Sequence, residues 1–157
     1  MMTKQKVYVF DLDGTIANLD HRLHFIKGTV KDWLGFFAAC DQDSPIEWVI
    51  DLMRCCATSS NLLILSGRNE SVRAQTEAWL RKHHTPIAEL LMRPADDRRP
   101  DDVLKIEMLW GWLSRNPGFE VAFIVDDRQR VVDMWRQEGF NVLQCQAWVE
   151  ACRATPS

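Results

Sequence analysis

Two aspartates that follow an apolar run are the first residues whose types and spacing could do chemistry. Asp11 and Asp13 come directly after residues 7–10 and stand at positions i and i+2. In an extended backbone this spacing points both carboxylates to one side of the chain. Two carboxylates so close repel each other unless a cation or a shared proton relieves them. The pair indicates a cation or acid–base site, with a solvated loop as the plain alternative, and Gly14 allows a tight turn behind it.

A second acidic pair follows another apolar run. Asp126 and Asp127 come directly after residues 121–125 and could supply further oxygen ligands. Mg²⁺ prefers carboxylates, water and substrate phosphate oxygens. The sequence therefore predicts a Mg²⁺ site whose candidate ligands are Asp11, Asp13, Asp126 and Asp127.

Groups suited to phosphate oxygens occur between these two pairs. Ser66, Gly67 and Arg68 follow residues 62–65 and offer a hydroxyl, backbone N–H groups and a guanidinium. An ordinary turn between a strand and a helix is the alternative. Lys105 stands one helical turn after Asp101, so its alternative is a surface ion pair.

The elements that must position these residues alternate along the chain. Five short apolar runs are predicted strands, and four longer stretches are predicted helices, at about 44–56, 70–83, 101–114 and 128–138. For the first helix, Ser44 is the expected N-cap, Pro45 the first helical residue and Glu47 the partner of the cap. Gly139 is expected to stop the last helix. Apolar runs without alternation suit strands covered on both faces, and the order predicts an α/β fold with a parallel sheet. The predicted strands are residues 7–10, 62–65, 90–92, 121–125 and 141–143. Sheets of this kind bind ligands at the carboxyl ends of their strands.

In this order the motifs resemble those of the haloacid dehalogenase-like (HAD) phosphohydrolase superfamily, over about residues 6–146. The resemblance implies a Rossmann-like fold with a mostly parallel five-stranded sheet, helices on both faces and a minimal cap. It also implies that Asp11 is the nucleophile, forming an aspartyl-phosphate, and that Asp13 is the general acid and then the base. Ser66 and Lys105 would hold the phosphoryl oxygens. Mg²⁺ would lie between Asp11, the Asp13 carbonyl and Asp126.

Competing phosphate-binding motifs are missing from the sequence. Neither GxxxxGK[ST] nor GxGxxG occurs, which argues against a P-loop kinase and a dinucleotide binder. Residues 16–43 leave room for one small lid, and residues 93–100 are too few for a second cap. We therefore expect an open site that could accept the end of a chain.

A closer resemblance is to the 3′-phosphatase domain of phage polynucleotide kinase. It rests on Met92-Arg93 and on residues 99–105, 125–128 and 131–136. That domain also carries an Arg eleven residues after the nucleophile, an Arg two residues after the motif Ser and an Asp four residues before the Lys. The resemblance thus implies a phosphate- or substrate-binding role, together with Ser66 and Gly67, for Arg22, Arg68 and Asp101.

The resemblance implies a polynucleotide 3′-phosphatase that acts on DNA or RNA ends. A nucleoside monophosphate phosphatase is the alternative, and a phosphate- or end-binding module without turnover is the non-enzyme hypothesis. The kinase domain of the phage enzyme has no counterpart in this sequence, so we expect no 5′-kinase activity. A separate kinase or ligase is therefore a candidate partner.

Arginines and aromatic residues offer contacts for a nucleic acid strand. Trp33 with Phe36 or Phe37 could stack a base, although packing of the lid is the alternative use. Six arginines could contact flanking phosphates, namely Arg22, Arg68, Arg73, Arg93, Arg98 and Arg99. For Arg73, Arg98 and Arg99 the alternative is that they merely offset neighbouring acids.

Composition narrows the class of protein. The 157 residues predict one domain, 1–157, with a frayed tail at 153–157. With 46% apolar and 26% charged residues, collagen-like and disordered classes are excluded, and a net charge of −3 argues against coating nucleic acid by bulk positive charge. No window approaches the roughly 20 apolar residues of a membrane span. Five cysteines without CxxC spacing predict reduced thiols and a cytoplasmic location.

Overall fold

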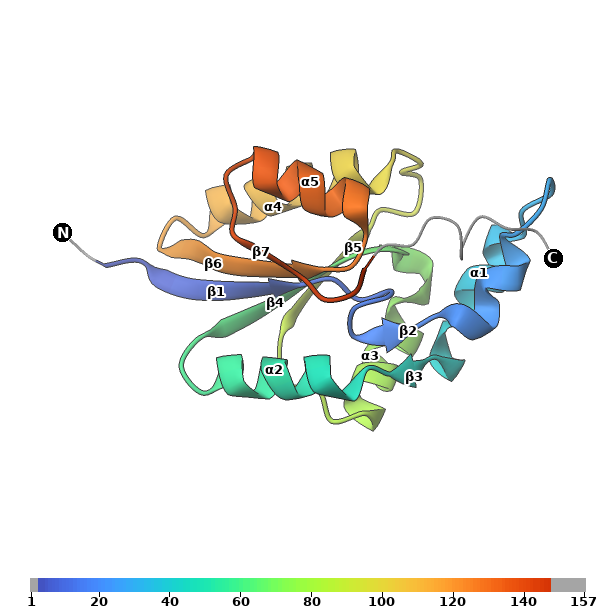
Figure 1. The fold of residues 1–157 in the computed structure, drawn as a ribbon, viewed down its shortest axis with the longest axis horizontal. Helices are drawn as coiled ribbons and strands as arrows, with labels where there is room; N and C mark the ends of the chain where they lie inside the picture. Colours follow the sequence, from blue (N-terminus) through green and yellow to red (C-terminus); the bar gives the residue numbers. More distant parts are fainter. Residues whose placement is uncertain (1–2, 148–157) are drawn as a thin grey trace.

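The computed structural model describes residues 3–147, so the predicted tail at 153–157 lies outside the described residues. Within the described range, one parallel sheet has the strand order β5-β4-β1-β6-β7 (Figure 1). The sheet confirms the predicted α/β fold. Each predicted strand overlaps an observed one, namely β1 Gln5–Phe10, β4 Asn61–Asn69, β5 Glu89–Arg93, β6 Phe119–Asp126 and β7 Val142–Gln144.

Helices cover both faces of this sheet. Two of them, α2 (Glu47–Ala57) and α3 (Arg73–Lys82), lie on one face, and α4 (Asp101–Arg115) and α5 (Gln129–Gln137) lie on the other (Figure 1). Successive residues of β4 alternate between two apolar cores, with Leu62 and Ile64 in one and Leu63 and Leu65 in the other. Burial on both faces explains why the strands are continuous apolar runs.

The start of α2 differs from the prediction. Ser44 and Pro45 do not cap the helix, and instead form a short strand, β3 (Ser44–Pro45), antiparallel to β2 (Ala17–Asn18). The helix begins at Glu47, where the Ile46 N–H donates to the carbonyl of Ile16 at 2.8 Å. Pairing with the segment that follows β1 therefore replaces the local capping box.

Two other helix boundaries follow from caps and backbone geometry. The helix predicted at about 70–83 opens with a 3₁₀ turn, η3 (Glu70–Val72), because the Asn69 side chain accepts from the Ser71 N–H. The last helix ends at Gln137, and Gly139 adopts φ +86°, as a residue that stops a helix commonly does.

The predicted lid lies beyond the carboxyl ends of the strands, where α1 projects in Figure 1. After β2, the elements of residues 16–43 are η1 (Asp20–Phe25), α1 (Trp33–Ala38) and η2 (Ala39–Gln42). The side chain of Asp32 caps α1 by accepting from the Gly35 N–H, and the Asp32 N–H donates to the carbonyl of Phe25. These bonds tie the short lid helix to the turn before it.

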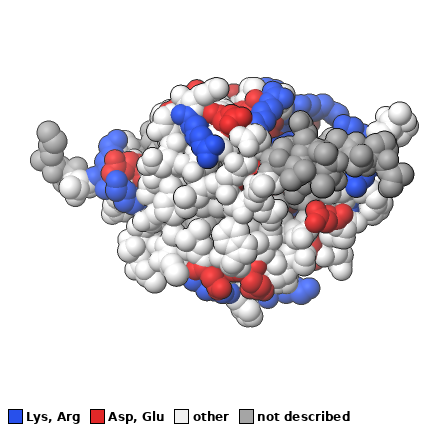
Figure 2. Space-filling model, viewed as in Figure 1, with Lys and Arg blue, Asp and Glu red and all other residues white. Residues whose placement is uncertain are grey.

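The surface agrees with the balanced composition. In the view of Figure 2 the centre of the near face carries few charged side chains, and acids and bases lie together along its upper and lower margins. Within residues 3–147, no helix combines the length and the apolar character needed to span a bilayer. Each cysteine in that range is free.

Candidate active site

The ends of β1 and β6 bring three aspartates together. Asp11 follows β1, Asp126 ends β6 and Asp127 follows it, while the Asp11 N–H donates to the carbonyl of Val125 at 2.9 Å. All three side chains are buried, and one carboxylate oxygen from each lies within 4.8 Å of the others. Asp11 of the first predicted acidic pair thus meets both members of the second, Asp126 and Asp127, at the centre of the sheet.

Lys105 reaches this cluster from α4. Its Nζ donates to Asp11 Oδ1 at 2.7 Å and to Asp126 Oδ2 at 3.0 Å. Burial opposes its positive charge, but the two carboxylates hold the pKa of Lys105 above its usual range. Lys105 is therefore a buried cation at the nucleophile candidate and not half of a surface pair with Asp101.

Like charges lie close together in the cluster. Burial raises the pKa of Asp11 well above its usual value, Lys105 opposes this, and Asp126 and Asp127 add to it. Three aspartates and one lysine thus gather in a buried place. Carboxylate oxygens so close together are the ligands that a divalent cation such as Mg²⁺ prefers, so the donor set fits such an ion.

The turn after β1 packs against the same cluster. Gly14 has φ +87°, and a Cβ at this position would lie 2.3 Å from Asp127 Oδ2. Thr15, which the sequence did not single out, donates from Oγ1 to Asp11 Oδ2 at 3.3 Å and lies 3.5 Å from Asp127 Oδ1. The glycine is therefore needed both for its backbone conformation and for the space it leaves.

The carboxylate of Asp13 is outside the three-aspartate cluster and contacts two arginines. Asp13 Oδ1 accepts from Arg22 Nη2 at 2.6 Å and from Arg68 Nη2 at 2.5 Å. Burial alone would raise the pKa of Asp13, but the two guanidinium groups lower it to about 2. Both arginine side chains are fully buried, and in this structure both form ion pairs with the Asp13 carboxylate.

A fourth buried acid, Asp43, completes this group and was missed by sequence reasoning. It accepts from Arg22 Nε and Nη2, both at 2.7 Å, and from Arg68 Nη2 at 3.0 Å. His21 Nε2 lies 2.8 Å from Asp43 Oδ1, and Trp79 Nε1 donates to the Asp43 carbonyl. The available signal was indirect: two buried arginines need two carboxylates to match their charge, and Asp13 supplies only one.

The remaining predicted site residues lie in the last part of β4 and at the start of α4. Ser66 is buried, and its Oγ accepts from the Arg68 N–H at 3.0 Å. Asp101, at the start of α4, accepts from Arg93 and from Arg128 Nη1. A Cβ on Gly67 would lie 2.5 Å from Asp101 Oδ1, so Asp101 packs directly against the Gly67 backbone.

Five of the six arginines considered for strand binding pair with acids, among them two of the three for which charge offsetting was the alternative. Arg73 contacts Glu70 and Glu77, and Arg99 contacts Asp97 and Glu107. For this pair the structure favours the alternative, in which the arginines offset neighbouring charge.

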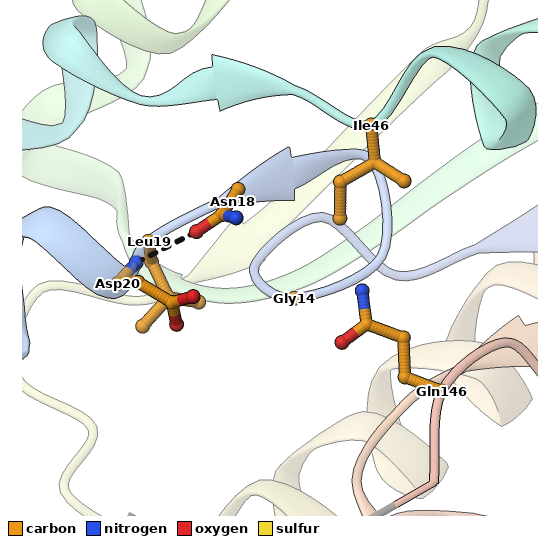
Figure 3. A pocket seen from close by; sticks show the side chains of 6 residues that line it. All are labelled: Gly14, Asn18, Leu19, Asp20, Ile46 and Gln146. Atoms are coloured by element: carbon orange, nitrogen blue, oxygen red, sulfur yellow. Dashed lines mark hydrogen bonds between the residues drawn. The ribbon is translucent and has the colours of Figure 1, made fainter.

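A small hollow lies behind the Gly14 turn, between Asn18, Ile46 and Gln146 (Figure 3). Its floor includes Asp20, whose N–H donates to Asn18 Oδ1 at 2.9 Å. The space of about 10 Å³ is enough for about one water molecule. The hollow is therefore not a substrate pocket.

The fold and site together define a class. The haloacid dehalogenase-like family protein SP0104 from Streptococcus pneumoniae, a hydrolase, superposes with a TM-score of 0.60 at 16% identity, over 90% of this chain and 84% of that one. This likeness shows the HAD-like fold. Because the chain also matches a family model of a phosphatase domain, the protein is a phosphatase of the HAD type.

Residues 5–147 match the family model of the polynucleotide kinase PNKP phosphatase domain, and the chain belongs to that family. A putative bifunctional polynucleotide kinase/RNA ligase of Autographa californica nuclear polyhedrosis virus is 29% identical over 80% of this chain, which spans 17% of that protein. A chain of the Pnkp1/Rnl/Hen1 RNA repair complex is 30% identical with a TM-score of 0.79, over 92% of this chain and 43% of that one. The chain therefore spans less than half the length of these relatives.

Proposed function

We propose that the protein removes 3′-phosphates from nucleic acid ends in a Mg²⁺-dependent reaction. The observation that carries the proposal is the buried arrangement of Asp11, Lys105, Asp126 and Asp127 in a chain of the polynucleotide kinase phosphatase family. The two relatives, a polynucleotide kinase/RNA ligase and a protein of an RNA repair complex, favour a nucleic acid end as the substrate. They also make a separate kinase or ligase the partner to look for.

Asp11 is the nucleophile in this proposal. One of its carboxylate oxygens forms a bond to phosphorus, the bond from phosphorus to the 3′ oxygen breaks, and that oxygen takes a proton from Asp13. Water then attacks the aspartyl-phosphate, gives a proton to Asp13 and releases inorganic phosphate and Asp11. Lys105 holds Asp11 in place and offsets charge on the phosphoryl oxygens.

The two arginines beside Asp13 suit its second role. They keep its carboxylate ionised in the free enzyme, as a group that accepts a proton from water must be. A bound phosphate dianion places negative charge near Asp13, which raises its pKa and favours the protonated form needed for the first step.

Asp11, Asp126 and Asp127 would hold Mg²⁺, with the Asp13 carbonyl as a further candidate ligand. The bound ion would supply neutralising charge between the carboxylates and the phosphate.

The test measures phosphate release from a 3′-phosphorylated oligonucleotide and from matched 3′- and 5′-mononucleotides, with Mg²⁺ and with a chelator. We expect the oligonucleotide to be preferred, the chelator to stop release and Asp11→Asn to abolish turnover. Equal or faster turnover of the mononucleotides would assign a nucleotidase instead. Unchanged turnover in Asp11→Asn would overturn the mechanism, and binding without any release would indicate an end-binding module.

A further inference from the structure

The lid helix α1 presents an aromatic surface that the catalytic proposal does not use. Trp33 is 48% exposed, although its ring stacks on Phe37 at 6.1 Å between centroids and meets the edge of Phe36 at 5.8 Å. The ammonium of Lys31 lies 5.7 Å from the centre of the Trp33 ring. Packing of the lid therefore accounts for only part of this ring, and a cation borders the rest.

A short series of contacts joins this surface to the site. The Arg22 guanidinium lies 4.3 Å from the centre of the buried Phe36 ring, and Arg22 Nη1 donates to the Phe36 carbonyl at 3.3 Å. The other side of the same guanidinium contacts Asp13. Trp33 is thus one ring beyond an arginine that touches the proposed acid–base residue.

The aromatic surface of Trp33 forms a platform on α1, and this platform is held in one place. The Asp32 side chain caps α1, and a Cβ on Gly35 would meet the Phe25 ring at 2.8 Å, so the helix packs closely on the preceding turn. A fixed aromatic ring loses little conformational entropy when a flat ligand stacks on it.

We propose that Trp33 stacks a nucleobase of a substrate strand whose 3′ end lies in the active site, and that Lys31 contacts a backbone phosphate of that strand. The inference rests on the proposed function. Bases stack on aromatic side chains whatever their sequence, and single-strand sites combine such rings with positive charge. Lys27 and Lys31 precede the ring, whereas the acid beside it, Asp32, is engaged in the helix cap.

Binding in a non-hydrolysing background tests the platform directly. Fluorescence anisotropy would measure the Kd of labelled single-stranded oligonucleotides for the Asp11→Asn protein with and without Trp33→Ala. We expect Trp33→Ala to weaken binding about 5- to 150-fold and Trp33→Phe to restore most of it, because stacking contributes about 1–3 kcal/mol per base. Trp110→Ala is the matched control, since Trp110 is 47% exposed on α4, away from the lid.

An abasic nucleotide placed at successive positions from the 3′ end locates the stacked base. At one position the abasic oligonucleotide should bind the protein that retains Trp33 more weakly than the intact oligonucleotide does. With this abasic oligonucleotide, Trp33→Ala should cause little further loss of affinity, as expected for two groups in contact. In the active enzyme, Trp33→Ala should lower the ratio of kcat/KM for the oligonucleotide to that for a 3′-mononucleotide.

Several results would overturn the inference. One is an equal loss of oligonucleotide affinity in Trp33→Ala and Trp110→Ala, and another is a loss of affinity in Trp33→Ala that persists at every abasic position. A third is an equal fall in kcat/KM for oligonucleotide and mononucleotide, which would mean that Trp33 only supports the lid. The inference also fails if Trp33→Ala binds the oligonucleotide as tightly as the protein with Trp33. The exposed Leu34 and Val30 would then mark the lid as a surface for a protein. If the wild-type enzyme prefers mononucleotides while the stacking effect on binding persists, the proposed function fails and the platform stands.

Discussion

Two arginines and two aspartates form a closed group of ion pairs beside the nucleophile candidate. Arg22 and Arg68 are each bonded to both Asp13 and Asp43, and both arginines and Asp43 are fully buried. Charges taken out of water must be matched, because an unpaired buried ion carries the whole desolvation penalty. Asp43 therefore positions both guanidinium groups and balances their charge.

Replacing Asp43 with Asn should be severe for this reason. We expect the free energy of unfolding to fall by about 3–5 kcal/mol, since the substitution leaves two buried guanidinium charges to share one carboxylate, that of Asp13. Urea denaturation measures the loss. Asp51→Asn is the control, because Asp51 forms an exposed pair with Arg54 and its removal should change stability by less than about 1 kcal/mol.

If Asp43 had only a structural role, its replacement would lower stability but not kcat. Turnover of Asp43→Asn is therefore measured under conditions in which the variant is still folded. Displaced arginines should lower kcat about 10–100-fold there. Normal kcat in the folded variant would contradict a positioning role for Asp43.

Asp13 makes the unfolding free energy depend on pH. Its pKa is about 2 in the folded protein against 3.8 ordinarily, so its contribution is complete above the ordinary value and is lost as the pH falls through the folded one. The difference corresponds to about 2 kcal/mol. Denaturation between about pH 5 and pH 2 should show a smaller decline for Asp13→Asn than for wild type. Parallel curves for the two proteins would show that Asp13 does not contribute.

At the scale of elements, the turn after β1 sets the position of the acidic cluster. Gly14 and Gly139 both have positive φ, at +87° and +86°. A Cβ on Gly14 would collide with the Asp127 carboxylate, whereas nothing lies within 4 Å of a Cβ on Gly139. Substitutions at the two positions therefore share the backbone strain, and only the one at Gly14 adds crowding at the site.

Gly14→Ala and Gly139→Ala should therefore differ in kind. Each substitution should cost about 1–2 kcal/mol through its backbone conformation. Only Gly14→Ala should also displace Asp127, and we expect it to lower phosphate release at least tenfold and to weaken the response to Mg²⁺. Steady-state assays with both variants check this. Equal activity in the two variants would show that the contact between Gly14 and Asp127 has no functional weight.

At the scale of the whole molecule, metal binding should be visible as stability. An ion that binds only the folded state raises the free energy of unfolding by about 2.7 kcal/mol at a hundred times its Kd. We expect the melting temperature to rise with Mg²⁺ and to return with a chelator. Asp127→Asn should abolish this response, because it removes one of the three carboxylates that would hold the ion. A full Mg²⁺ response in Asp127→Asn would place the ion elsewhere.

Much of this molecule could be predicted from local pattern. The alternation of apolar runs and helical periods determines the α/β sheet, since a strand buried on both faces and an amphipathic helix each leave a signature within a few residues. The order of strands and helices brings Asp11, Lys105 and Asp126 together, because the carboxyl ends of parallel strands share one edge of the sheet.

Only the tertiary structure decided the rest. Ser44 and Pro45 carry a local helix-start signal, but the prediction from it was wrong. They pair with β2, and the Ile16 carbonyl, contributed by a distant segment, accepts from the N–H of Ile46. Asp43 belongs to no motif and gains its importance from arginines 21 and 25 residues away. A local pattern records the interactions of neighbours along the chain, whereas the matching of buried charge depends on which distant segments the fold brings into contact.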